Sequence, residues 1–139
     1  MDFRYDRSSN ILFSLHDGRI KKIIFNDNIL TLKIDKLFRY AENEEKIYSG
    51  DVVFYEIELD ECTVLIFDKI VYEGDFSGKA IGLKEYIEKS SDMEFEILTE
   101  GYFGYNTIYT GWLWEEGKEP VSATMYIWNT GDMVYRINE

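Results

Sequence analysis

Apolar and polar residues alternate along most of the chain, which is the period of a β-strand with one buried face. The clearest example is a hairpin over residues 15–34, in which two apolar arms flank an Asn-Asp-Asn turn at 26–28. Asn and Asp tolerate the left-handed backbone that tight hairpin turns require. In the second arm Leu30, Leu32 and Ile34 share one face. The pattern therefore predicts a hairpin with one face in the core.

The same alternation continues in the second half of the chain. It predicts a second hairpin over 52–72 and, after Asp92, a meander of three or four strands. Clusters of Gly, Asn, Asp and Pro at 101–106, 116–120 and 129–132 mark the turns of this meander. The return arm of the second hairpin is apolar on both sides, so we expect both of its faces to be covered.

Two stretches depart from strand alternation. Residues 77–90 carry Ala80, Leu83 and Ile87 at helical spacing, which predicts one helix of two or three turns. Residues 41–51 form the longest polar interval, and we expect an exposed loop there.

Length and composition fit one packed domain spanning residues 1–139. A chain of 139 residues can bury a core, and 45% of its residues are hydrophobic. Aromatic residues reach 17%, and these side chains suit the half-buried surface of a sheet. We therefore predict an α+β fold that is predominantly antiparallel β. It would have about eight strands in a curved sheet or open barrel, with one short helix near 77–90.

The formal net charge of −12 comes from 27 acidic and 15 basic residues. Such a surface repels phosphate backbones and anionic lipid, so we expect neither nucleic acid nor a membrane as a partner. Basic proteins and cations are favoured, although the charge would also serve solubility alone. No apolar run approaches the ~20 residues of a membrane span, and no apolar signal region opens the chain. Cys62 is the one cysteine, so no intramolecular disulfide can form, and we expect a cytoplasmic location.

Candidate catalytic residues are few. His16 and Asp17 are adjacent, but the chain has a single histidine, and a zinc site or hydrolytic triad needs more such groups. The chain also lacks a Cys pair, a Gly-rich phosphate loop and a nucleophile elbow. We therefore expect no metal, no cofactor and no enzymatic activity, and we interpret Asp17-Gly18 as a turn.

Paired carboxylates are the one catalytic chemistry that spacing cannot exclude, because two acids ~5 to 10 Å apart suffice in glycosidases. Glu94, Glu96 and Glu100 lie along one predicted strand, where alternation with apolar residues explains them as a solvated face. A carboxylate-pair hydrolase therefore remains an alternative function.

The most suggestive feature is the density of aromatic residues in the last third of the chain. Pairs of them share a face on each of two neighbouring predicted strands, where cross-strand packing would stabilise the sheet by about 0.2 to 1 kcal/mol per pair. Alternatively they form a recognition surface, since Trp and Tyr dominate binding hot spots. Glu115 and Glu116 follow the strand that carries Trp112 and Trp114, and acids at this position would suit a basic partner. The candidate binding residues are Trp112, Trp114, Tyr126, Trp128, Glu115 and Glu116.

One short run carries a family resemblance. The sequence His-Asp-Gly-Arg-Ile at 16–20, followed by Ile23 and Leu-Thr-Leu at 30–32, resembles the openings of small bacterial β-rich proteins. Several of those are predicted immunity proteins of polymorphic toxin systems. The resemblance covers residues 15–34 and implies a cytoplasmic, non-enzymatic protein that binds and blocks a cognate toxin domain. It assigns a role to no individual residue.

Three functions follow as hypotheses. The first is an acidic interaction module of the immunity type, which would neutralise a basic partner such as a toxin domain. The second is a β-barrel that binds a sugar or lipid through the aromatic face, and it requires an enclosed cavity. The third is the carboxylate-pair hydrolase, which requires a cleft holding an acid with a raised pKa.

Overall fold

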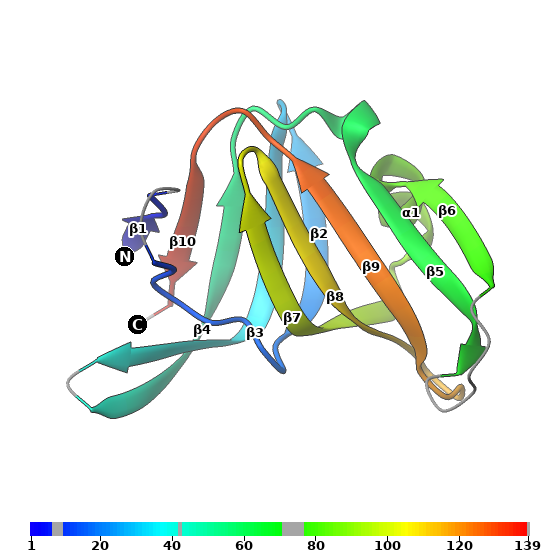
Figure 1. Ribbon diagram of the computed structural model, residues 1–139, viewed down its shortest axis with the longest axis horizontal. Helices are drawn as coiled ribbons and strands as arrows, with labels where there is room; N and C mark the ends of the chain where they lie inside the picture. Colours follow the sequence, from blue (N-terminus) through cyan, green and yellow to red (C-terminus); the bar gives the residue numbers. More distant parts are fainter. Residues whose placement is uncertain (7–9, 42, 71–76, 139) are drawn as a thin grey trace.

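The described residues form ten strands, which hydrogen-bond into one antiparallel sheet (Figure 1). The computed structural model describes residues 1–6, 10–41, 43–70 and 77–138. In chain order the strands are β1 (Asp2–Arg4), β2 (Arg19–Asn26), β3 (Ile29–Ala41), β4 (Glu44–Phe54), β5 (Thr63–Ile70), β6 (Gly78–Gly82), β7 (Met93–Phe103), β8 (Asn106–Glu115), β9 (Val121–Trp128) and β10 (Met133–Ile137). The described helical elements are the 3-10 helix η1 (Leu59–Glu61) and the α-helix α1 (Leu83–Lys89). The predominantly antiparallel β fold with one short helix is confirmed, although the strands outnumber the prediction.

The sheet curls so that its two halves face one another. The strand order across it is β1-β10-β4-β3-β2-β7-β8-β9-β5-β6. In the view of Figure 1, β7, β8, β9 and β5 lie in front of β4, β3 and β2. One apolar core joins the two halves and includes Leu32, Val52, Tyr109 and Met125. Because β1 and β6 end the order without pairing to each other, the sheet does not close into a barrel.

The hairpin predicted over 15–34 is present as β2 and β3. Its turn residues Asp27 and Asn28 have φ angles of 52° and 61°, the left-handed conformation that Asn and Asp tolerate. Leu30 and Leu32 are fully buried, so the alternation identified the correct face.

The exposed loop predicted over 41–51 is wrong. β3 continues to Ala41 and β4 begins at Glu44, so most of this interval belongs to a long two-stranded arm. The end of the arm projects away from the two halves of the sheet (Figure 1), and Tyr40 and Ile47 on it are exposed. Strands that leave the core have no buried face, so they lose the alternation on which the prediction rested.

Only the second half of the helix predicted over 77–90 is present. Only Leu83–Lys89 is helical, whereas 78–82 forms β6 and pairs with β5. Leu83 lies in the core, but Ala80 is exposed on the edge strand, so their helical spacing is accidental. A Cβ at Gly78 would collide with the carbonyl oxygen of Ile66, and this close approach is open only to glycine.

The second predicted hairpin, over 52–72, is also wrong. β4 pairs with β3 and β10, whereas β5 pairs with β9 and β6. Residues 55–62, which include η1, carry the chain from one half of the sheet to the other. Alternation identified both strands but not their partners; residues 71 and 72 lie outside the described residues.

The meander predicted after Asp92 is confirmed for β7, β8 and β9, which pair in sequence order. The fourth strand of the prediction, β10, instead lies between β1 and β4 on the other half of the sheet. In the part of the chain that the structure describes, no helix has the length and apolar character needed to span a membrane.

Candidate interaction surface

The predicted aromatic residues lie on the face of β8 and β9 that is turned away from the core. Leu113 on β8 and Ile127 on β9 are buried in the core, and their sequence neighbours point to the opposite face. All four outward aromatic side chains are half-buried by their neighbours. They are Trp112, Trp114, Tyr126 and Trp128.

The strand register separates these side chains into two groups, Trp112 with Trp114 and Tyr126 with Trp128. Trp112 lies opposite Ser122, and Tyr126 lies opposite Ile108. The two positions on β8 are four residues apart, or about 13 Å at ~3.3 Å per residue. Trp112 packs edge-on against Trp114, with ring centroids 5.9 Å apart. The residues share a face as predicted, but no cross-strand aromatic pair joins the two groups.

The group around Trp128 includes two residues that the sequence analysis missed. Tyr105 packs edge-on against Trp128 with ring centroids 5.8 Å apart, and Tyr105 is 49% exposed. Phe103 is 82% exposed at the end of β7, and the register places it on the outward face. The glycine-aromatic run at 101–106 was the available signal, but it was interpreted only as a turn. We call the combined surface the outer aromatic face, comprising Phe103, Tyr105, Trp112, Trp114, Tyr126 and Trp128.

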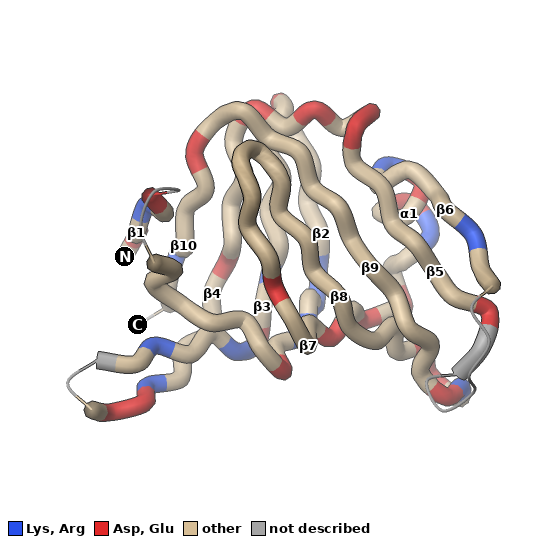
Figure 2. Tube along the Cα trace, viewed as in Figure 1, with Lys and Arg blue, Asp and Glu red and all other residues tan. Residues whose placement is uncertain are grey.

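The outer aromatic face is free of formal charge along its centre. Residues 63–67 of β5, 106–114 of β8 and 121–128 of β9 contain no Asp, Glu, Lys or Arg. Figure 2 shows the same strands as continuous tan tubes, with coloured charges gathered at their ends. In a chain with a net charge of −12, the absence of charged residues is unusual for a surface that faces water.

At one end of the face, Arg19 and Glu96 hold Trp114 in place. The Arg19 guanidinium lies 4.6 Å from the centroid of the Trp114 ring and forms ion pairs with Glu94 at 3.1 Å and Glu96 at 3.5 Å. The Trp114 indole N–H donates to Glu96 Oε1 at 3.0 Å. A hydrogen bond from Lys21, reinforced by Arg19, lowers the pKa of Glu94 despite partial burial. Glu94 and Glu96 therefore both bond to neighbouring side chains of the fold.

Exposed acids flank the face at both ends. Glu115 and Glu116 lie beyond Trp114, where Glu115 pairs with Lys118 at 3.1 Å and Glu116 is exposed. At the opposite end the Glu58 backbone N–H donates to the Trp128 carbonyl at 3.1 Å, which places Glu58 and η1 beside the end of β9. Figure 2 shows red segments at both ends of β9. We call the acids at the two ends the acidic rim, comprising Glu58, Asp60, Glu61, Glu115 and Glu116; Glu115 is half-buried and the other four are exposed.

His16 is held by local contacts rather than by a catalytic constellation. Its ring stacks on Phe38 with centroids 4.3 Å apart, and its two nitrogens lie 3.3 Å from Asp17 and from the Tyr40 hydroxyl. Asp17 has a φ angle of 62°, consistent with the turn predicted at Asp17-Gly18. His16 therefore attaches the turn to the base of the β3–β4 arm.

The solvated glutamate face predicted for β7 is wrong at Glu100. A bulge between Ile97 and Thr99 changes the phase of the strand, so Glu100 points inward while Glu94 and Glu96 point outward. Inside, the Glu100 carboxylate accepts hydrogen bonds from the Leu15 backbone N–H at 2.6 Å and the Tyr102 hydroxyl at 2.7 Å. This bulge was not visible in the alternation.

Among the described residues, no three His, Cys, Asp or Glu side chains come together in a way that could hold a metal ion. No protein-family model matches the chain, and no curated protein or solved structure shows significant similarity to it.

Proposed function

We propose that the protein is a non-enzymatic interaction module of the immunity type, acting in the cytoplasm. It would bind a basic protein, such as a toxin domain, through the outer aromatic face and the acidic rim. The observation that carries the proposal is an aromatic, uncharged strand face with exposed acids at both ends, on a chain whose net charge is −12.

The two parts of this surface have separate physical roles. Aromatic side chains give large contact area with few rotatable bonds, and they are enriched at the centres of protein interfaces. Carboxylates at the rim attract a basic partner over distances of about 10 Å and speed its association. A toxin domain that binds nucleic acid offers the matching positive surface, since it must accommodate phosphates.

The alternative of a sugar- or lipid-binding barrel is less well supported. The sheet is open, and Trp112 and Tyr126 point away from the core rather than into an enclosed interior.

The hydrolase alternative is also less well supported. It requires an acid with a raised pKa, and the ion-paired Glu94 has a lowered one. Glu96 is bonded to Trp114 and Arg19, and Glu100 to Tyr102 and Leu15, which leaves neither carboxylate free for a substrate.

Co-expression and binding with the basic product of a neighbouring toxin-like gene test the proposal. We expect protection of the host cell, and binding in vitro that weakens steeply as salt is raised, because the rim charges become screened. Absence of binding at low salt, together with absence of protection, would contradict it.

A further inference from the structure

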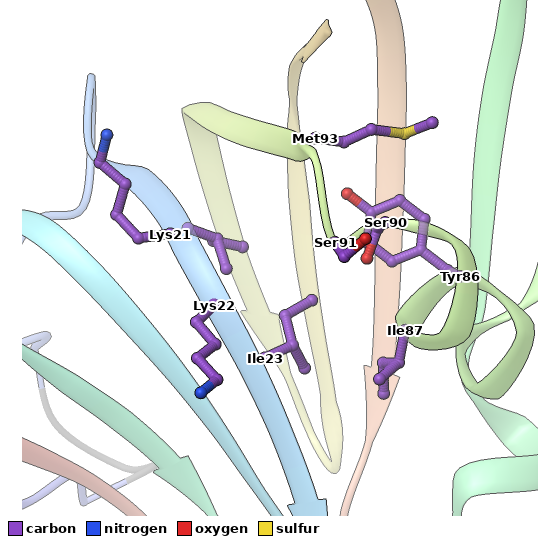
Figure 3. A pocket seen from close by; sticks show the side chains of 9 residues that line it. Lys21, Lys22, Ile23, Tyr86, Ile87, Ser90, Ser91 and Met93 are labelled. Carbon is purple, nitrogen blue, oxygen red and sulfur yellow. The ribbon is translucent and has the colours of Figure 1, made fainter.

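The sheet splits where β2 leaves β7, and α1 lines the opening. β2 pairs with β7 only through Arg19 and Ile20, although β2 continues to Asn26. A bulge in β2 after Ile20 accompanies the separation. Figure 3 shows the resulting gap, with β2 on one side and α1 on the other. A partly enclosed pocket of about 270 Å³ lies there.

The walls of this pocket are apolar and continuous with the core. Ile23 of β2 and Ile87 of α1 lie on opposite sides of the gap, and Met93 of β7 lies nearby (Figure 3). These three side chains are partly buried and pack against the core. A ligand in contact with them would remove apolar surface from water, which is favourable.

The lining residues bring no unpaired charge into the pocket. The nine of them include two lysines and no acid. Lys21 forms an ion pair with Glu94 at 2.9 Å, and Lys22 is exposed on the face of β2 opposite Ile23. An ion would lose hydration in this pocket without gaining an opposite charge, which is unfavourable. The pocket therefore favours an uncharged ligand.

A buried polar side chain of the lining, Tyr86, has no hydrogen-bond partner. It is only 3% exposed, and its hydroxyl points from α1 toward the gap (Figure 3). The hydroxyl forms no hydrogen bond with any residue that the structure describes. Withdrawing a hydroxyl from water without a partner is unfavourable, and phenylalanine would fill the same space without that penalty. Fold stability therefore explains the Tyr86 ring but not its hydroxyl.

Burial also determines what this hydroxyl can do. It raises the pKa of the Tyr86 phenol, so the group keeps its proton at neutral pH and can donate a hydrogen bond. Ser90 and Ser91, which follow α1, line the pocket and add two further hydroxyls. Apolar walls with a small number of polar groups are the usual composition of a small-molecule site.

We propose that this pocket binds a small uncharged molecule with an apolar body and a carbonyl oxygen. The oxygen accepts a hydrogen bond from the Tyr86 hydroxyl, and the apolar body packs between Ile23 and Ile87. The pocket is at the small end of ligand sites, which span about 300–1,000 Å³, so a compact molecule fits better than a long-chain lipid. This site is separate from the outer aromatic face, and the inference does not depend on the proposed function.

Titration with cyclohexanone, followed by NMR of methyl-labelled protein, tests the site. We expect saturable shifts of the Ile23, Ile87 and Met93 methyl signals at millimolar cyclohexanone. Cyclohexylammonium and cyclohexanecarboxylate keep the ring but carry a charge, and neither should saturate these signals. Absence of saturation with cyclohexanone would mean that water alone meets the Tyr86 hydroxyl, and it would overturn the proposal. Charged probes that bind as well as cyclohexanone would overturn it too.

One variant tests the hydrogen bond itself. Tyr86→Phe keeps the buried ring and should weaken cyclohexanone about fivefold, the usual effect of losing one hydrogen bond between uncharged groups. Tyr40→Phe is the matched control, because it removes a phenol hydroxyl from the exposed arm, and it should leave the affinity unchanged. Equal affinities of the two variants would contradict the role assigned to the Tyr86 hydroxyl.

Discussion

Strands β7 and β8 carry aromatic residues on both faces, and the two faces differ in what those residues contact. On the inner face Tyr109 is completely buried in the apolar core, beside Tyr102 and Tyr135. On the outer face Trp112 and Tyr126 remain partly exposed, with threonine and serine between them. Aromatic content alone therefore does not separate a core from a recognition surface. We assign stability to the inner face, and the proposed function places binding on the outer aromatic face.

Alkaline pH should affect the inner residues most strongly. Burial raises the pKa of Tyr86, Tyr102, Tyr109 and Tyr135 above the ordinary value. The unfolded chain releases these protons near pH ~10 while the folded protein retains them, so their contribution to stability is complete below that pH and declines above it. The loss is about 1.4 kcal/mol per tyrosine for each pH unit, until the pKa of the folded state is reached.

Denaturant unfolding across the alkaline range measures this effect, and tyrosinate absorbance reports the ionisation. Four of the 11 tyrosines should ionise only as the protein unfolds. Ionisation of all the tyrosines together in the folded protein would contradict the assignment of these four to the core.

Truncation of an inner aromatic residue should be the most damaging single substitution. Tyr109→Ala should lower the free energy of unfolding by about 3–5 kcal/mol, because it leaves a large cavity in the core. Tyr109→Phe is the control and should cost only about 1 kcal/mol, because it keeps the buried ring and removes the hydroxyl alone. Chemical denaturation distinguishes the two variants; equal losses would contradict the assignment of the Tyr109 ring to the core.

Loss of the inward Glu100 carboxylate should have an intermediate effect. Glu100→Ala leaves the Leu15 N–H and the Tyr102 hydroxyl without their acceptor, which should destabilise the fold by about 1–3 kcal/mol. Glu116→Ala on the acidic rim, measured in the same denaturation experiment, should change stability by less than about 0.5 kcal/mol. If both variants behave alike, Glu100 does not connect β7 to the segment before β2.

Substitution on the outer aromatic face should change stability least. Phe103→Ser removes a side chain that is 82% exposed, so the free energy of unfolding should change by less than about 0.5 kcal/mol. Thermal denaturation compared with Tyr40→Ser, which changes a 64% exposed aromatic on the arm, checks this expectation. A large loss for Phe103→Ser alone would place that residue in the fold rather than in a binding surface.

Alternation predicted the strands wherever one face is buried, as in the β2–β3 hairpin and the β7–β9 meander. Alternation failed where the structure of a segment depends on residues distant in the sequence. The β3–β4 arm has no core to face, and the partners of β5 depend on where the whole sheet curls. The bulge that turns Glu100 inward occurs where Gly111 lets β7 and β8 approach closely, because a Cβ there would collide with the Glu96 carbonyl.

The residues of the outer aromatic face and the acidic rim, like the strands, were predicted only in part. Alternation placed Trp112 and Trp114 on one face, and that face is the outward one. Phe103 and Tyr105 were missed because their exposure depends on how the β7–β8 turn projects. The acidic rim at Glu58 was missed because η1 reaches Trp128 only through the crossing of the chain between the halves.

The most direct test of the account is the affinity of one basic toxin domain for a matched pair of variants, measured by calorimetry at low salt. The pair is Phe103→Ser with Tyr126→Ser on the outer aromatic face, against Tyr40→Ser on the arm. We predict that the first variant binds at least about tenfold more weakly than the natural protein, the loss of a moderate hot spot, and that the second binds normally. Equal affinities for both variants would contradict the assignment of binding to the outer aromatic face.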